Sequence, residues 1–173
     1  MRLDVLGPMI LNGAAGEVVV TGVKTRQILT VLALSSPTQA TLERLIDLLW
    51  VDPPASAAKT VQAHVSRLRR ALADADASGS LVSSRAGYRL DLGDRVDAYV
   101  LAQLTRQAVA ARDGGDPRVA ANLFGQARAL WRGEPELPDT PAADALRRSL
   151  HEQRLELASA HLGALAAAEP LDE

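Results

Sequence analysis

The stretch KTVQAHVSRLRRAL, at residues 59–72, decides the fold of this chain. Its apolar side chains recur every three or four residues, which is the spacing of one face of an α-helix. They are Val61, Val65, Leu68 and Leu72. We therefore predict a helix that runs from an N-cap at Ser56 to about Ala75 and buries one narrow apolar seam.

The remaining faces of this helix are polar and basic. No Asp or Glu occurs between Lys59 and Arg70, so the i,i+4 ion pairs of an ordinary surface helix are absent. A helix fits the major groove of DNA when one face docks on the protein and another offers donors to phosphates and base edges. The predicted helix meets both conditions, and a solvated charged face unrelated to DNA is the alternative interpretation of the same residues.

The residues before this helix predict a small antiparallel sheet and two further helices. Short apolar or alternating runs predict strands at 2–6, 9–11 and 17–20, with a turn at Asn12-Gly13. Helical periodicity follows at 24–35, and then from an N-cap at Thr41 to the break at Asp52-Pro53-Pro54.

A hairpin is predicted directly after the basic helix. Strands at 81–83 and 88–92 are joined around Arg85-Ala86-Gly87, and the hairpin carries Arg85 and Arg89 as a wing beside a recognition helix would. Tyr88, Leu90 and Leu92 would share one of its faces.

Everything beyond Asp97 is predicted to be helical, at 97–112, 117–131 and 142–167, with a proline-rich loop at 133–141. The middle helix would turn five residues inward: Val119, Leu123, Phe124, Ala127 and Leu130. A helix pair joined by a Gly-Asp-Pro turn and followed by another helix is typical of tetratricopeptide-like hairpins. The predicted fold class is therefore mainly α, with a small β-sheet and a wing hairpin.

Composition excludes several classes of protein. The chain has 173 residues, 47% of them hydrophobic, and contains no cysteine, so disulfides, thiolate zinc sites and cysteine nucleophiles are excluded. No apolar run is long enough to span a bilayer and no signal segment is evident, which predicts a cytoplasmic setting without membrane contact. The net charge of −2 divides into +2 for residues 1–92 and −4 for residues 93–173.

Catalytic, metal and cofactor sites are not predicted. His151 opens a stretch similar to a zinc-protease helix, but Leu155 stands where the second ligand would be. His151 and His161 lie on nearly opposite faces of one predicted helix and cannot chelate together. The glycines before Lys24 have the wrong spacing for a phosphate-binding loop. We expect a protein that is not an enzyme and has no metal or cofactor.

The basic helix and the hairpin together resemble the winged helix-turn-helix of OmpR/PhoB-type regulators. This unit comes first, without a receiver domain, and a helical array containing ALWRG at 129–133 follows it. That order is similar to the SARP group, the Streptomyces antibiotic regulatory proteins. Three further motifs strengthen the match: LGP at 6–8, LIDLLW at 45–50 and PPASA at 53–57. The resemblance implies a DNA-binding domain over residues 1–93 and a partial bacterial transcriptional activation domain, tetratricopeptide-like, over 94–173.

The exposed face of the basic helix and the resemblance together predict the contacts with DNA. They are Lys59, Thr60, Gln62, Ala63, His64, Arg67, Arg69, Arg70, Arg85 and Tyr88. Arg67 and Arg69 are the strongest candidates, because Arg can bond bidentately to guanine. The resemblance places Arg85 near the minor groove, and Tyr88 either near a phosphate or packed at the base of the wing.

The loop between the second and third helices corresponds to the polymerase-contacting loop of the family. Its residues are Val51, Asp52, Pro53, Pro54 and Ala55. Two prolines alone would also explain an exposed loop. Trp50 and Trp131 are expected to be core anchors rather than ligand contacts.

One feature departs from the family. The activation domain of the family continues for several more helices, whereas this sequence stops at Glu173, which implies a truncated second domain. The last helix then lacks the partner that would cover its Leu155, Leu162 and Leu165 side. It folds back on the earlier hairpin, is covered in a dimer, or belongs to a truncated form.

We expect a sequence-specific transcriptional regulator, an activator of a biosynthetic gene cluster. The resemblance implies binding to double-stranded DNA at promoter direct repeats, recruitment of RNA polymerase, and a homodimer or tandem oligomer on DNA. Two alternatives stay open: a truncated repressor or decoy, and a protein-interaction module that does not bind DNA.

Overall fold

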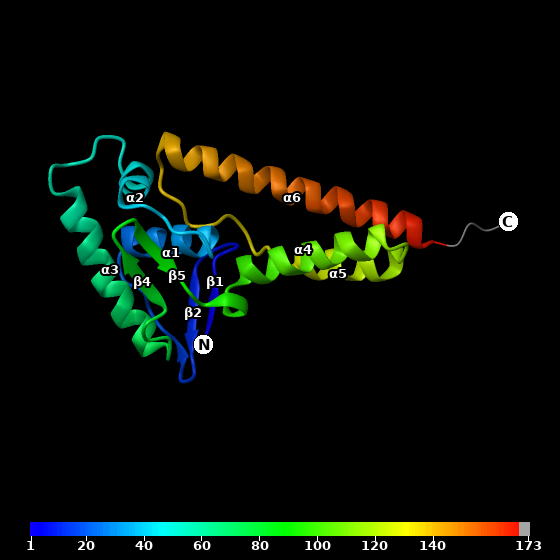
Figure 1. The fold of residues 1–173 in the computed structure, drawn as a ribbon, viewed down its shortest axis with the longest axis horizontal. Coiled ribbons are helices and arrows are strands. Elements are labelled where there is room, and N and C mark those ends of the chain that lie inside the picture. The colour runs from blue at the N-terminus through cyan, green and yellow to red at the C-terminus, as the bar shows by residue number, and fades with distance from the viewer. Residues whose placement is uncertain (170–173) are drawn as a thin grey trace.

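A computed structural model describes residues 1–169 and shows two adjoining parts (Figure 1). The first, which we call the winged-helix unit, contains β1 (Arg2–Asp4), β2 (Ile10–Gly13), β3 (Gly16–Glu17), α1 (Val23–Ser35), α2 (Leu42–Leu49), α3 (Ala57–Asp74), β4 (Leu81–Ser84) and β5 (Gly87–Leu90). A 3-10 turn, η1 (Gly93–Arg95), leads to the second part, the helical array of α4 (Asp97–Asp113), α5 (Pro117–Ala129) and α6 (Pro141–Ala168). The last four residues of the predicted second domain, 170–173, lie outside the described part.

The N-terminal sheet is antiparallel in the order β1-β2-β3. Asn12 pairs with Glu17 and Gly13 with Gly16, so the turn lies at residues 14–15 and the predicted turn at Asn12-Gly13 was wrong. The predicted strand at 17–20 was also wrong beyond Glu17. Val18 still donates a hydrogen bond to the carbonyl oxygen of Leu11 at 2.7 Å, but the strand ends at Glu17 and Val20 is buried in the core.

The predicted seam of α3 is confirmed, since all four of its residues are at most 1% exposed: Val61, Val65, Leu68 and Leu72. They pack with α1 and α2 in the main core. Thr41 caps α2 as predicted, because its Oγ1 accepts a hydrogen bond from the Arg44 N–H at 3.1 Å. Ser56 precedes α3 as predicted, but its side chain makes no capping bond.

The wing is formed by β4 and β5, which pair from Leu81↔Leu90 to Ser84↔Gly87. Gly87 has φ +138, and a Cβ there would lie 2.1 Å from the carbonyl oxygen of Ala40. Only glycine permits this approach. The approach lets the backbone groups of Tyr88 and Ala40 exchange hydrogen bonds of 2.8 and 2.9 Å, which attaches the wing to the rest of the unit.

The helical array packs α5 between α4 and α6. Its buried residues include Phe124 and Ala127, as predicted. Val119 was predicted to point inward but is 46% exposed, and its neighbour Ala120 is buried instead, because close helix packing selects the smaller side chain there. Leu123 and Leu130 are half-buried, and α5 ends at Ala129, two residues before the predicted end.

The long helix α6 is covered on one side only. Leu157 and Ala164 are buried, whereas Leu155, Leu162 and Leu165 are 58%, 62% and 44% exposed. Within residues 1–169 this side of α6 is exposed, while its other side packs on α5.

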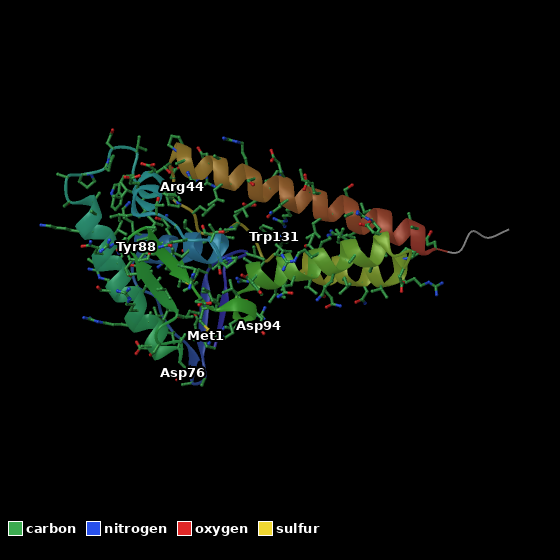
Figure 2. The ribbon with its side chains drawn as sticks, viewed as in Figure 1. Met1, Arg44, Asp76, Tyr88, Asp94 and Trp131 are labelled. Carbon is green, nitrogen blue, oxygen red and sulfur yellow. The ribbon has the colours of Figure 1, made fainter. Side chains whose placement is uncertain are left out.

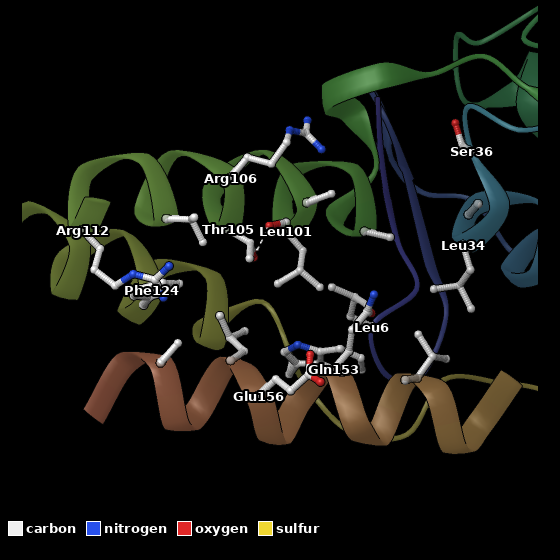
Figure 3. Close-up of a pocket in the computed structure, with 18 residues that line it drawn as sticks. Leu6, Leu34, Ser36, Leu101, Thr105, Arg106, Arg112, Phe124, Gln153 and Glu156 are labelled. Carbon is white, nitrogen blue, oxygen red and sulfur yellow. Dashed lines mark hydrogen bonds between the residues drawn. The ribbon is translucent and has the colours of Figure 1, made fainter. Parts of the chain in front are cut away.

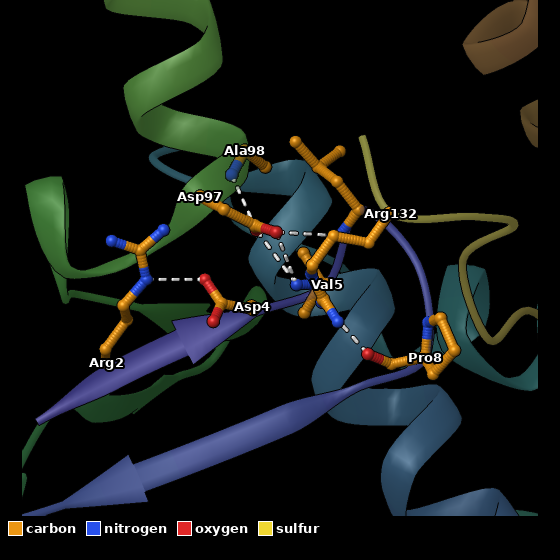
Figure 4. A network of polar contacts seen from close by, with 8 residues as sticks. Arg2, Asp4, Val5, Pro8, Asp97, Ala98 and Arg132 are labelled. Carbon is orange, nitrogen blue, oxygen red and sulfur yellow. Dashed lines mark hydrogen bonds and ion pairs between the residues drawn. The ribbon is translucent and has the colours of Figure 1, made fainter. Parts of the chain in front are cut away.

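Polar contacts fasten the array to the winged-helix unit (Figure 4). The buried carboxylate of Asp97 accepts hydrogen bonds of 2.8–2.9 Å from the backbone N–H groups of Val5, Leu6 and Ala98. The backbone N–H of Arg132 donates to the carbonyl oxygen of Leu6 at 2.7 Å, and its guanidinium donates to that of Pro8 at 2.9 Å. The two parts therefore share a hydrogen-bonded boundary at the start of α4.

None of the helices in residues 1–169 combines the length and the hydropathy that a membrane span requires.

Candidate nucleic-acid interface

Helix α3 lies at the end of the molecule opposite to α5 and to the C-terminal end of α6 (Figure 1). Because the apolar seam holds the opposite face in the core, the exposed side chains point into solvent: Lys59, Gln62, Ala63, Ser66, Arg67 and Arg70. Within residues 1–169, Arg67 and Arg70 form no ion pair or side-chain hydrogen bond. Both guanidinium groups are available for an anionic partner.

Arg69 has a different setting from Arg67. It lies on the side of α3 that faces the wing, and its Nη2 donates to the hydroxyl of Ser83 and, at 3.5 Å, to the carbonyl oxygen of Leu81. Arg69 therefore bridges α3 and β4. Fixing the angle between helix and wing is a role that the sequence pattern did not indicate.

His64 and Thr60 are the less exposed of the predicted contacts on α3. The Nδ1 of His64 lies 2.8 Å from the hydroxyl of Thr25 on α1. Burial, and then the positive charges of Arg67 and Lys24, lower the pKa of His64 below its ordinary value. The hydroxyl of Thr60 donates to the carbonyl oxygen of Ser56 at 3.1 Å, within its own helix.

The wing places its two predicted residues in different surroundings. Arg85 is exposed at the hairpin tip, between β4 and β5. Tyr88 is half-buried and packs against the core of the winged-helix unit (Figure 2). Its position agrees with packing at the base of the wing, the second of the two roles expected from the sequence.

The five residues of the α2–α3 loop are all exposed, from Val51 to Ala55. The sequence did not indicate the contact that Lys24 makes beside this loop. Its Nζ donates to the carbonyl oxygen of Leu49 at 2.8 Å and lies 4.5 Å from the centroid of the Trp50 ring. Lys24 thus covers the C-terminal end of α2, where cations are favoured by the helix dipole. Trp50 is half-buried against the main core.

The histidines of the array are not brought together. His151 is exposed, and the Nδ1 of His161 lies 3.0 Å from Arg128. In the part of the chain that the structure describes, no group of three His, Asp or Glu side chains is placed to hold a metal ion.

Comparison with known protein families divides the chain into two matches. Residues 16–90 match the family "Transcriptional regulatory protein, C terminal", and residues 96–173 match the "Bacterial transcriptional activator domain". Both descriptions refer to transcriptional regulators rather than enzymes.

Similar regulators occur in Streptomyces and Mycobacterium. Regulatory protein DnrI of Streptomyces peucetius is 32% identical over 176 residues, covering 96% of this chain and 63% of DnrI. Regulatory protein AfsR of Streptomyces griseus is 35% identical, with 94% of this chain and 16% of AfsR covered. Transcriptional regulatory protein MoaR1 of Mycobacterium tuberculosis is 34% identical, with 80% and 46% covered. The chain spans less than two thirds of the length of each.

A solved structure shares the arrangement over most of this chain. Mycobacterium tuberculosis EmbR, in complex with a low-affinity phosphopeptide, superposes with a TM-score of 0.82 at 27% identity, covering 94% of this chain and 45% of EmbR. This likeness confirms the predicted fold class, mainly helical with small antiparallel sheets and a tetratricopeptide-like part. With the winged-helix match first and the activator-domain match second, the chain belongs to the SARP-type transcriptional regulators.

Proposed function

We propose that residues 1–93 act as a DNA-binding domain and residues 94–173 as part of an activation domain. The outward face of α3 carries the proposal, because it presents Arg67 and Arg70, which have no ion pair among residues 1–169, and because no carboxylate lies between Lys59 and Arg70 in the sequence. In a winged helix, such a face enters the major groove while the wing approaches the flanking minor groove.

The predicted contacts fall into three roles. Arg67, Arg70 and Gln62 have the side chains that can read base edges, and Lys59 is suited to a phosphate. Arg85 extends from the wing tip toward the minor groove. Arg69 acts indirectly, by holding the wing at its angle to α3 through Ser83.

The wider activity follows the family. The exposed loop at residues 51–55 would contact RNA polymerase, and copies of the chain would bind side by side on promoter direct repeats, as a dimer or tandem oligomer. A bacterial regulator that acts on promoters in this way works in the cytoplasm.

The main test is a fluorescence-anisotropy titration of DNA that has been selected from a random pool by this protein. Arg67→Ala should weaken binding by about 1–3 kcal/mol and relax preference at one base position, because it removes a base contact. Arg148→Ala is the matched control, since Arg148 is exposed on α6, far along the chain from α3, and should leave binding unchanged.

Salt dependence separates this proposal from a protein-interaction module. A DNA-binding domain releases counterions, so the logarithm of its affinity should fall with the logarithm of salt at about −0.9 per phosphate contacted. A flat salt response, or unchanged binding by Arg67→Ala, would overturn the assignment of α3. A reporter assay then decides between an activator and a repressor or decoy, because only the activator raises transcription from the selected site.

A further inference from the structure

A cavity of about 630 Å³ lies between α4 and α6, where the array meets the winged-helix unit (Figure 3). Leu6 and the end of α1 close it on the side of the winged-helix unit, and Phe124 of α5 forms part of its wall. Figure 3 shows Leu101 pointing from α4 toward α6. None of the predicted DNA contacts lines this cavity.

The size and the walls suit a small organic molecule. Pockets for such ligands measure about 300–1,000 Å³ and are lined mainly by apolar side chains with a few polar groups. Here the apolar lining is supplied chiefly by these side chains: Leu6, Leu34, Leu101, Val109, Phe124 and Leu157.

One polar group in the lining lacks a hydrogen-bond partner. Trp131 borders the cavity, and its Nε1–H is buried without an acceptor among the described residues. A buried donor that stays unpaired costs about 1–3 kcal/mol, so an acceptor on a ligand would recover that energy. The Nε1–H of Trp131 is thus an unsatisfied donor in the wall of the cavity.

The charged residues of the lining favour an acid. They are two guanidinium groups of α4, from Arg106 and Arg112, and one carboxylate of α6, from Glu156. Arg112 is held 3.0 Å from Asp113, whereas Arg106 has no ion pair within residues 1–169. Arg106 is exposed and has free capacity for an anion, and Figure 3 shows its guanidinium at the outer edge of the cavity, on the side of α4 away from α6.

We propose that this cavity binds a mainly apolar organic acid. The apolar body lies between α4 and α6, a hydrogen-bond acceptor meets the Nε1–H of Trp131, and the acidic group meets Arg106. Because residues of the winged-helix unit and of the array both line the site, the ligand contacts both. This site goes beyond the proposed DNA-binding function and does not depend on it.

The test uses 8-anilinonaphthalene-1-sulfonate, a fluorescent probe with two aromatic groups and a sulfonate, titrated into the whole protein. We expect saturable binding to a single class of site, with transfer of excitation from tryptophan to the probe. Ala102→Phe should weaken binding by about tenfold or more, because Ala102 lines the cavity yet is exposed, so the larger ring fills the cavity without overpacking the core.

Leu162→Ala is the matched control, because it removes apolar surface from the uncovered side of α6, outside the cavity. It should bind the probe as the unaltered chain does. Arg106→Gln should weaken the binding of the sulfonate probe by several fold. It should leave the binding of the uncharged probe N-phenyl-1-naphthylamine unchanged. Unchanged binding by Ala102→Phe, loss of binding in Leu162→Ala, or equal effects of Arg106→Gln on both probes would each overturn the proposal.

Discussion

The winged-helix unit and the helical array are both built on buried apolar side chains, but their cores differ in composition. Large side chains such as Ile28, Leu45 and Leu68 fill the first, all of them completely buried. Alanines supply most of the second, around Phe124 and Leu157. Since stabilisation follows the apolar area removed from water, at about 25 cal/mol per Å², the array gains less per residue. The alanine-rich core around Phe124 should therefore open before the core of the winged-helix unit.

The largest effect is expected from Phe124→Ala, which removes the fully buried aromatic side chain of the alanine-rich core. We expect a loss of about 3–5 kcal/mol in the stability of the array, because a buried Phe is replaced by a cavity. Hydrogen exchange resolved by region should show faster exchange in α4–α6 and little change in α1–α3.

Leu68→Ala makes the reciprocal test in the first core. The free energy of unfolding should fall by about 2–5 kcal/mol. DNA binding should weaken as well, because α3 loses a buried contact that holds it against the core. Leu162→Ala, at an exposed position, should change stability by less than about 0.5 kcal/mol. Equal loss of protection in both parts after Phe124→Ala would show that the two cores unfold together.

Asp97→Asn tests the joint between the two parts. The amide can no longer accept from all of the N–H groups that the carboxylate binds, so stability should fall by about 1–3 kcal/mol. Burial raises the pKa of Asp97 above 3.8. The folded chain then holds this proton more tightly than the unfolded chain, so the contribution of Asp97 is full at low pH and is lost as pH rises through the folded pKa.

Urea unfolding of the unaltered protein and of the Asp97→Asn variant should therefore show a larger loss of stability in the variant near about pH 4 than near about pH 7. Asp94→Asn, at an exposed position in η1, serves as the control and should change little at either pH. A deficit that does not vary with pH would contradict the assigned direction.

The smallest effect is expected on the pH dependence of DNA binding. It is tested by comparing two partly buried histidines, one in each part of the molecule. The neighbourhood of His64 lowers its pKa in the free protein, and a nearby phosphate would raise it again. DNA binding should then take up a proton, so affinity should rise, by less than about tenfold, as pH falls from about 7.5 to 6. His64→Gln should flatten this dependence in an anisotropy titration. His161→Gln should preserve it, and a flat profile in the unaltered chain would remove His64 from the contact region.

The spacing of apolar residues along the sequence predicted the helices and the hairpin, whose formation depends on residues close together in the chain. The spacing of Val61, Val65, Leu68 and Leu72 was enough to define the buried seam of α3, and alternation was enough to find the hairpin. The identity of the exposed face followed, because whatever is not in the seam must point away from the core.

Contacts between distant segments could not be predicted in this way. The bond from Arg69 to Ser83 depends on the angle at which the hairpin docks, and that angle is set in part by Gly87 against Ala40. The exposure of Val119 depends on which neighbour of α5 comes closest. Neither follows from periodicity, since periodicity identifies a face and not its partner.

Residues from the later part of the chain complete the core of the winged-helix unit, and this limits how the unit can be joined to other domains. Leu3 pairs with Val96, and Leu137 and Ala143 of the later chain are buried in the same core as α1–α3. A fragment cut after residue 93 would lose these side chains together with the acceptor for the N–H groups of Val5 and Leu6. A gene fusion that moves the winged-helix unit to a new output domain must therefore carry these residues along or supply substitutes.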